Sequence, residues 1–414
     1  MKFNSQNGTN KAIVFNCNFN GLSIIQELGR RGVSCIAMDC SRSIGTYSRY
    51  AKYVKCADPA GYESRFIDQL YELCKKEKEK PVLFPTNDIW AQAIARNKTA
   101  LSAVSIPCVS NQEVVELVLD KQKFYELGNR NSYLTPRTYT LSQVMKCLDI
   151  DFPIIAKPNA RRSSSDHGLD AKLLETELDR LRLTKIYDKR ALETFLTKEK
   201  DYLPFLIFQQ LIMGVSDQMF TVGVYADVHS DLIGTFTGRK VRGYPAEYGD
   251  CIVGEVYQVP DRLIENTAKI VKELKYKGIA EFEYKRHEMT GVYYLIEINP
   301  RSWSWIGITP ACGVSLPWLA YTDLLKADYD GKHNCKHLKN GEVKYVKYLE
   351  DFDNCINNYK KHFPLWHMGL KQWKNSLACQ KLVKAEFSPD DITVSLASIK
   401  NFIVNKTKRL IKRT

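Results

Sequence analysis

Residues 279–301, IAEFEYKRHEMTGVYYLIEINPR, constrain the fold of this chain more than any other segment. Apolar and polar side chains alternate at both ends of the segment, and this period of two predicts two strands. The residues between them, 286–291, end in Thr290 and Gly291, a pair that favours a turn. We therefore expect an antiparallel strand pair here.

The predicted strand pair gathers carboxylate and amide side chains on one surface. One face of the first strand carries Ile279, Glu281, Glu283 and Lys285, and one face of the second carries Leu295, Glu297 and Asn299, with Tyr294, Ile296 and Ile298 on its opposite face. The oxygens of Glu283, Glu297 and Asn299 suit a hard cation such as Mg²⁺ and its phosphate ligands. A solvated sheet face is the alternative interpretation, but the apolar neighbours and the nearby Arg301 favour the metal site.

The length of 414 residues is too great for one compact core and predicts two or three domains. The polar N-terminus lacks the apolar region of a secretory signal, and no apolar run approaches the ~20 residues that span a bilayer. The 12 cysteines form no Cys-x-x-Cys pair, which favours free thiols in a reducing compartment and predicts a cytoplasmic protein. Zinc binding by His333, Cys335 and His337 is disfavoured because a second ligand pair is missing.

The formal net charge of +13 is compatible with nucleic acid, an anionic membrane or phosphorylated substrates as partners. No RNP, KH or zinc-finger pattern accompanies the charge, so nucleic-acid binding is not favoured. Residues 392–414 are predicted to form a basic, moderately amphipathic helix that lies on the inner face of the membrane. A frayed, solvated tail is the alternative.

The order of the predicted elements divides the chain into three parts. Residues 1–112 alternate strands and helices, beginning with strands at 11–17 and 33–38 around one helix, which favours a parallel sheet. This part lacks a G-x-G-x-x-G sequence, so a dinucleotide fingerprint is not supported. Residues 113–328 hold further strands and helices, including the strand pair, and residues 329–414 form a C-terminal extension of weaker pattern.

Other polar groups in the second part fit a nucleotide phosphate site. Lys157 ends the buried strand IIAK, from which an ammonium can reach a phosphate oxygen, and Lys121 follows a short apolar helix. The serine-rich loop 159–168 can supply hydroxyl and backbone N–H groups to phosphates. The apolar hinge after Gln210 offers unpaired backbone groups to an adenine edge.

In this order, the motifs resemble the ATP-grasp superfamily across residues 112–326, and across most of 10–326 with the first domain included. The elements that carry the resemblance are Asp120-Lys121, IIAKP, the small-residue loop, FQQLIMG, EFEYK and IEINPR. The resemblance implies an α/β and α+β fold: a Rossmann-like pre-ATP-grasp domain, then a two-subdomain ATP-grasp fold and a small C-terminal extension. Within the superfamily, the chain looks most like carboxylate–amine ligases of the D-aspartate ligase and carbamoyl-phosphate-synthase-like type.

The resemblance also implies roles for individual residues, with ATP and Mg²⁺ or Mn²⁺ as cofactors. The residues expected to contact ATP are Lys121, Lys157, Ser163, Ser164, Ser165, Gln210, Ile212 and Asp217. The expected metal ligands are Glu283, Glu297 and Asn299, and the expected catalytic cations are Arg301, Lys240 and Arg242. The chain departs from the family where Gln210 replaces a frequent glutamate and where the phosphate loop is rich in serine and arginine rather than glycine.

The reaction implied by the resemblance is amide formation from a carboxylate and an amine, such as an amino acid, through an acyl phosphate. The implied partners are these small molecules, a lipid-linked or cell-envelope acceptor that would account for membrane contact, and a second copy of the chain in a homodimer. Two alternatives stay open: carboxylase or carbamoyl-phosphate-type chemistry with bicarbonate, and a basic nucleotide-binding protein without catalysis.

Overall fold

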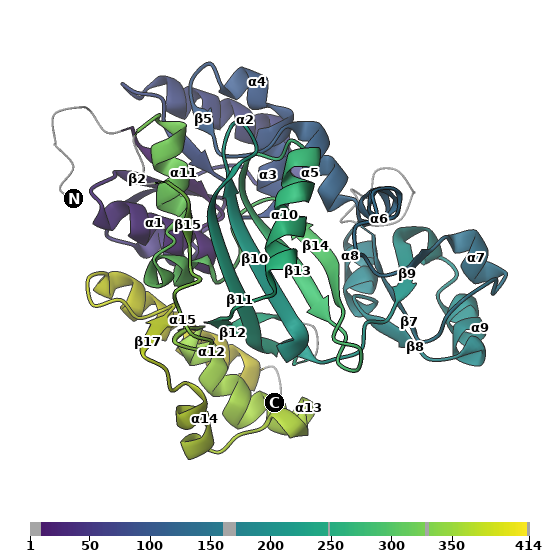
Figure 1. The fold of residues 1–414 in the computed structure, drawn as a ribbon. Helices are drawn as coiled ribbons and strands as arrows, with labels where there is room; N and C mark the ends of the chain where they lie inside the picture. Colours follow the sequence, from purple (N-terminus) through teal and green to yellow (C-terminus); the bar gives the residue numbers. More distant parts are fainter. Residues whose placement is uncertain (1–9, 160–170, 247–248, 328–330, 412–414) are drawn as a thin grey trace.

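The computed structural model describes residues 10–159, 171–246, 249–327 and 331–411. The described chain builds three sheets, which Figure 1 shows side by side, with the longest sheet in the middle. Ser163, Ser164 and Ser165 of the predicted phosphate loop lie outside the described residues.

The first sheet is parallel throughout and has the strand order β3-β2-β1-β4-β5. Its strands are β1 (Ala12–Phe15), β2 (Cys35–Asp39), β3 (Ala51–Lys55), β4 (Val82–Phe84) and β5 (Ile106–Pro107), and its helices are α1 (Phe19–Arg30), α2 (Pro59–Lys75), α3 (Asp88–Arg96) and α4 (Lys98–Leu101). Alternate side chains of β1 enter different cores: Val14 packs in the cluster that includes α1, and Phe15 packs in the cluster that includes α2 and α3. Helices therefore cover both faces of this sheet.

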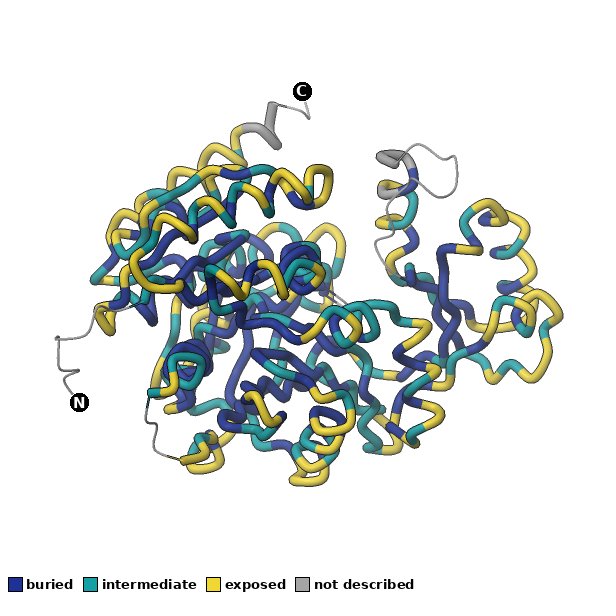
Figure 2. The backbone as a smooth tube through the Cα atoms, turned by 90° about the horizontal axis from the view of Figure 1, so that it is seen from above, coloured by how far each residue is buried: buried dark blue, intermediate teal, exposed yellow. Residues whose placement is uncertain are grey.

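A smaller antiparallel sheet has the order β6-β9-β7-β8. It consists of β6 (Thr138–Tyr139), β7 (Ile154–Pro158), β8 (Thr184–Ile186) and β9 (Leu206–Gln210), with α7 (Leu141–Met145), α8 (Ala171–Arg180) and α9 (Lys189–Lys198) around it. Figure 2 shows this lobe standing to one side of the rest of the molecule. The helices α5 (Gln112–Leu119) and α6 (Lys121–Arg130) precede it in the chain.

The large sheet has the order β14-β13-β10-β11-β12-β16-β17, with β15 paired to β11. Its strands are β10 (Met219–Ala226), β11 (Leu232–Tyr244), β12 (Asp250–Val256), β13 (Gly278–Arg286), β14 (Tyr293–Asn299), β15 (His333–Asn334), β16 (Val343–Val346) and β17 (Lys381–Lys384). Helix α10 (Asp261–Glu273) covers one face, and Trp303, Trp305 and α11 (Leu316–Leu324) pack on the other. Strands β15 to β17 come from the predicted C-terminal extension, so the sheet continues across the predicted boundary at residue 328.

The remaining elements complete the connections and the C-terminal part. The helices there are α12 (Tyr348–Asp353), α13 (Tyr359–His362), α14 (Leu370–Ser376) and α15 (Ile392–Ile411), and the short turns of 3₁₀ or π helix are Ile44–Tyr47, Leu203–Phe205, Ser216–Gln218, Ile306–Cys312, Asn354–Asn358 and Pro364–Trp366. Within the described ranges, no helix is long and apolar enough to cross a membrane.

The strand pair β13–β14 forms as predicted, but a bulge changes one face. Glu283 lies opposite Glu297 and Tyr284 lies opposite Leu295, so Ile296 has no partner across the ladder. Because of this extra residue, Leu295 packs in the same core as Ile298, under α10, and not on the face of Glu297. The predicted position of Leu295 beside Glu297 and Asn299 is therefore wrong.

Candidate active site

Three carboxylates and an amide meet on the face of β13–β14 that is turned away from α10. Glu281 lies opposite Asn299 in the ladder, next to the Glu283–Glu297 pair. The Nδ2 atom of Asn299 donates to Oε2 of Glu281 at 3.0 Å and to Oε1 of Glu283 at 3.2 Å. We call Glu281, Glu283, Glu297 and Asn299 the acidic face.

Like charges and burial shift the pKa values of these carboxyl groups. Burial and the neighbouring Glu283 raise the pKa of Glu281 to about 8, and burial and Glu297 raise that of Glu283, which Lys240 opposes. Burial alone would raise the pKa of Glu297 as well, but Lys121 and other nearby cations lower it overall. Glu297 therefore carries its negative charge more readily than Glu281 and Glu283 do.

Two lysines reach toward the acidic face from α6 and β7. Nζ of Lys121 lies 3.5 Å from Oε1 of Glu297. Lys157 is buried, and its Nζ donates to the hydroxyl of Tyr125 at 3.0 Å. Burial and the charge of Lys121 lower the pKa of Lys157 to about 7. The two ammonium groups thus lie beside one another and beside Glu297, in agreement with the predicted proximity of these residues.

The hydroxyl of Tyr125 links this lysine pair to the strand bulge. It donates to the carbonyl of Ile296, the residue that the bulge leaves without a ladder partner. The tyrosine therefore holds Lys157 against β14 through one hydrogen bond on each side. The sequence prediction missed Tyr125, although its spacing of four from Lys121 places both on one side of α6.

Arg301 joins the acidic face to the first sheet. Its Nε donates to Oδ1 of Asp88 at 2.8 Å, and its Nη2 donates to Oδ1 of Asn299 at 3.0 Å. Asp88 begins α3 directly after Asn87, whose side chain caps that helix. Burial disfavours the charge of Arg301, but Asp88, Glu281 and Glu297 outweigh it and raise the pKa of the guanidinium. The sequence prediction missed the pairing of Asp88 with Arg301.

Lys240 and Arg242, both on β11, have different surroundings. Nζ of Lys240 donates to the carbonyl of Gly249 at 3.0 Å. Burial opposes the charge of Lys240, but Glu283 is the largest of the groups that raise its pKa, which places the ammonium near the acidic face. Lys240 therefore stays among the candidate catalytic cations.

Arg242 points into the C-terminal part of the chain. Its Nε and Nη2 donate to the two oxygens of Asp351, each at 2.8 Å, and its Nη1 donates to Oγ of Ser376 at 3.0 Å. The side chains of Arg242 and Asp351 are 2% and 0% exposed. The guanidinium is fully occupied by protein groups and is closed to substrate, so we remove Arg242 from the candidate catalytic residues.

The predicted adenine contacts lie where β9 leaves the small sheet for the large one. The backbone N–H of Gln210 donates to the carbonyl of Arg137, and that of Leu211 donates to the carbonyl of Pro153. Ile212 is buried, and Asp217 lies in the short turn before β10. The three predicted residues therefore follow one another along the hinge between the two sheets.

By chemical type, the oxygen donors of the acidic face suit a divalent cation such as Mg²⁺, although their present arrangement does not gather three carboxylates around one point. Hard cations prefer carboxylate and amide oxygens, and a bound cation would offset the burial and the repulsion from Glu297 that raise the pKa of Glu283. Asn299 turns its NH₂ group toward the carboxylates, so its Oδ1 would have to rotate inward to become a ligand. In the part of the chain that the structure describes, no group of three or more His, Cys, Asp or Glu residues is arranged to hold a metal.

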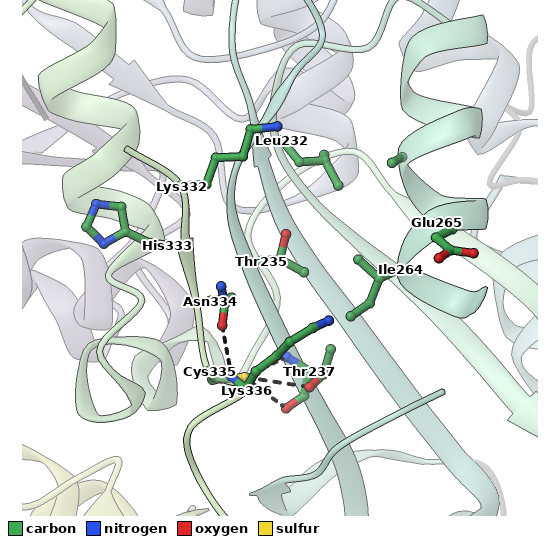
Figure 3. Close-up of a pocket in the computed structure, with 11 residues that line it drawn as sticks. Leu232, Thr235, Thr237, Ile264, Glu265, Lys332, His333, Asn334, Cys335 and Lys336 are labelled. Atoms are coloured by element: carbon green, nitrogen blue, oxygen red, sulfur yellow. Dashed lines mark hydrogen bonds between the residues drawn. The ribbon is translucent and has the colours of Figure 1, made fainter. Parts of the chain in front are cut away.

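A separate hollow of about 270 Å³ lies between β11, α10 and residues 332–336. Figure 3 shows Cys335 at its wall, where Sγ accepts from the backbone N–H of Thr237 at 3.3 Å, while the His333 ring is directed away from that sulfur. His333 and Cys335 therefore do not turn toward one another.

Comparison with known proteins shows distant similarity to ligases and synthetases. The chain is 26% identical over 278 residues to the D-aspartate ligase of Enterococcus faecium, a match that covers 61% of this chain and 62% of that protein. It is 23% identical over 260 residues to the carbamoyl phosphate synthase large chain of Clostridium acetobutylicum, which covers 59% of this chain and 22% of that protein. The chain thus spans less than two thirds of the length of either relative. No protein-family model matches the chain.

Solved structures share the fold at low sequence identity. The biotin carboxylase domain of the Hydrogenobacter thermophilus 2-oxoglutarate carboxylase, in complex with MgADP, ADP and bicarbonate, superposes with a TM-score of 0.59 at 14% identity over 79% of this chain and 72% of that one. The L-amino acid ligase of Bacillus licheniformis superposes with a TM-score of 0.56 at 14% identity over 77% and 75%. The mixed parallel and antiparallel sheets are those of the ATP-grasp fold. These relatives and solved structures belong to the ATP-grasp superfamily, so the resemblance to that superfamily which the sequence predicted is confirmed.

Proposed function

We propose that this protein is an ATP-dependent ligase that joins a carboxylate to an amine through an acyl phosphate. The observation that carries the proposal is the meeting of the acidic face with Lys121, Lys157 and Arg301 on one surface of the large sheet. Phosphoryl transfer requires positioned substrates and neutralised charge rather than a protein nucleophile, and this surface offers both.

In this proposal, each group of side chains has one task. Lys121 and Lys157 bind the ATP phosphates, while Gln210, Ile212 and Asp217 border the base and ribose along the hinge. Glu283, Glu297 and Asn299 hold Mg²⁺ or Mn²⁺, which neutralises phosphate charge when bound. Arg301 and Lys240 orient the substrate carboxylate and the phosphoryl group.

The proposed reaction has two steps. A carboxylate oxygen attacks the γ-phosphorus of ATP, and the bond to the bridging oxygen of ADP breaks, which gives an acyl phosphate and ADP. The lone pair of the amine then attacks the acyl carbon, inorganic phosphate leaves, and the nitrogen loses a proton to solvent. Water competes with the amine for the acyl phosphate, so the closed site has to exclude water during the reaction.

The test is a screen of amino acids and simple carboxylates for stimulated release of phosphate from ATP. We expect release to require one carboxylate and one amine together, and Glu297→Ala to abolish it. Unchanged turnover in Glu297→Ala would refute the assignment of the metal ligands. ADP release with bicarbonate alone would favour carboxylase or carbamoyl-phosphate-type chemistry, the second candidate, which the similarity to a bicarbonate-bound biotin carboxylase domain supports.

A further inference from the structure

Lys347 is a buried lysine without an anionic partner. It follows β16 directly, and its exposed fraction is 7%. Its backbone N–H donates to the carbonyl of Ile252 at 2.9 Å. Among the residues that the structure describes, no hydrogen bond or ion pair reaches its Nζ, which lies 5.4 Å from the ring centroid of Phe19. A buried charge that lacks a partner is costly, so a retained one indicates that a ligand supplies the anion.

The side chain of Lys347 lies on the face of the large sheet that meets the first sheet. Side chains alternate along β16, so Lys347 shares a face with Val343 and Tyr345, both in the core cluster that contains Trp305. The hydroxyl of Tyr345 donates to the carbonyl of Ser304 at 3.1 Å, which fixes this face against the segment after Arg301. The side chain of Lys347 therefore lies on the side of the large sheet that packs against the segment after Arg301.

Lys240 and Lys347 both lie near the thiol of Cys251. Burial raises the pKa of Cys251 to about 12, and the two lysines are the largest opposing influences. Lys347 thus lies on the side of the sheet that carries the acidic face, next to Lys240.

The N-terminus of α1 is the second half of this site. The helix has 12 residues, and its N-cap residue Asn18 makes no side-chain capping bond. Asp39 accepts from the N–H of Cys17, and in the described part of the chain the N–H groups of Phe19 and Asn20 have no acceptor. Free N–H groups at a helix start attract anions. The ring below Lys347 belongs to the first residue of this helix, so the ammonium lies close to the helix N-terminus.

The position also agrees with the topology of the first sheet. Helix α1 follows β1, and the neighbouring strand β4 leads to Thr86 and Asp88, so the order β3-β2-β1-β4-β5 reverses its direction between β1 and β4. Ligands of open parallel sheets bind outside the strand ends at such a reversal. Nδ2 of Asn20 donates to the carbonyl of Thr86 at 2.6 Å, which holds the two strand ends together.

We propose that Lys347 and the N-terminus of α1 bind a substrate carboxylate other than the one that reacts. The reacting carboxylate has its own cations, Arg301 and Lys240, beside the acidic face. The inference rests on the proposed ligase function and narrows the substrate class: either the acyl substrate is a dicarboxylate, or the amine substrate is an amino acid bound by its carboxylate. Lys347 is then a specificity-determining residue.

The test is calorimetric titration of the full chain, saturated with Mg²⁺ and ADP, with succinate, L-alanine and D-aspartate. Lys347→Met keeps the length of the side chain and removes its charge. We expect this variant to bind at least one of the three probes about 30-fold or more weakly than wild type does, as is typical when one partner of a buried charge pair is lost. Lys347→Arg should restore most of the binding, and the ADP affinity should stay the same. Lys344→Met is the matched control, because Nζ of Lys344 donates to the carbonyl of Ser376 on the opposite face.

Each outcome of the titration has one meaning. Weakened succinate binding with unchanged L-alanine binding assigns the site to a dicarboxylate acyl substrate, and the reverse assigns it to the amine substrate. Equal affinities in wild type and Lys347→Met, or no binding of any probe to a wild-type protein that binds ADP, overturn the inference while the ligase proposal stands. If Lys347→Met binds the probes more weakly but the wild-type protein does not turn over ATP, the anion-binding site is supported and the ligase proposal is refuted. Lys347→Gln provides a second variant, and both should melt no earlier than wild type, because the unpaired charge is gone.

Discussion

The buried pair of Arg242 and Asp351 provides the sharpest test of the revised site. The carboxylate of Asp351 accepts from Nε and Nη2 of Arg242 at 2.8 Å each and from Nε1 of Trp373 at 2.8 Å. The third nitrogen of the guanidinium, Nη1, donates to Oγ of Ser376 at 3.0 Å. Since both side chains are almost wholly buried, removal of one leaves an uncompensated charge in a dry site. Arg242→Met should therefore cost about 3–5 kcal/mol of local stability.

The double variant separates a structural role from a catalytic one. In Arg242→Met with Asp351→Leu, both charges are gone and the volume is retained, so the loss should fall to about 1–2 kcal/mol, mainly because the indole N–H of Trp373 and the hydroxyl of Ser376 lose a partner. The double variant should be more stable than either single variant and should still turn over ATP. A catalytic Arg242 would leave the double variant folded and inactive.

Native-state hydrogen exchange is the suitable assay, because a chain with three sheets need not unfold in one step. The opening free energy is read from peptides that cover β11, α12 and α14. Arg182→Met is the control: Arg182 pairs with Asp250 on β12, next to β11, and the two side chains are 57% and 72% exposed, so a loss below about 1 kcal/mol is expected. A loss of that small size in Arg242→Met, or single-variant losses that simply add in the double variant, would refute the reasoning.

Three further predictions concern the proposed site and the tail. Lys157 has a pKa of about 7, so it is mostly neutral at pH 8 and mostly charged at pH 6; since bound phosphates restore its charge, ADP binding should be accompanied by the uptake of about 0.9 proton at pH 8 and almost none at pH 6. Calorimetry in buffers of different ionisation enthalpy measures this uptake, and equal uptake in Lys157→Met would contradict the prediction. Arg301→Gln should lower turnover by about 100-fold or more with little change in ADP affinity, because the guanidinium orients the substrate carboxylate and the phosphoryl group. A parallel loss of ADP binding would indicate that Arg301 has a structural role through Asp88. A larger fraction of the full-length protein than of the double variant Leu396→Glu, Ile403→Glu should pellet with anionic vesicles, because Leu396 and Ile403 are 62% and 57% exposed on α15. Equal pelleting of the two proteins would refute the membrane hypothesis.

Local alternation was sufficient to predict the metal-binding candidates. Glu283 and Glu297 pair across the ladder as expected, because side-chain direction in a strand follows from the sequence period alone. The strand β3 was missed, since its residues 51–55 include two lysines and are only partly buried at a sheet edge, which gives no apolar run. Residues 343–346 were assigned to a separate extension because their pairing with β12 is made over a sequence distance that no local pattern reports.

The error at Arg242 has a different origin. Lys240 and Arg242 are two residues apart, so a regular strand would place both on one face, as the family resemblance implied. The β11–β12 ladder shifts register between Lys240 and Arg242 and again before Gly243. These irregularities send Lys240 toward Glu283 and Arg242 toward Asp351. No spacing rule in the sequence signals such a shift.

The same kind of irregularity builds the phosphate end of the site. In β14, the bulge frees the carbonyl of Ile296, and that carbonyl accepts from Tyr125, which in turn accepts from Lys157. A regular ladder would occupy this carbonyl, and the lysine from the small sheet would have no fixed contact with the large one. Tyr125→Phe is therefore expected to loosen the hold on Lys157 and to raise the KM for ATP more than it lowers kcat, as steady-state kinetics can measure. If kcat alone fell, Tyr125 would act on the reacting groups and not on the position of the lysine.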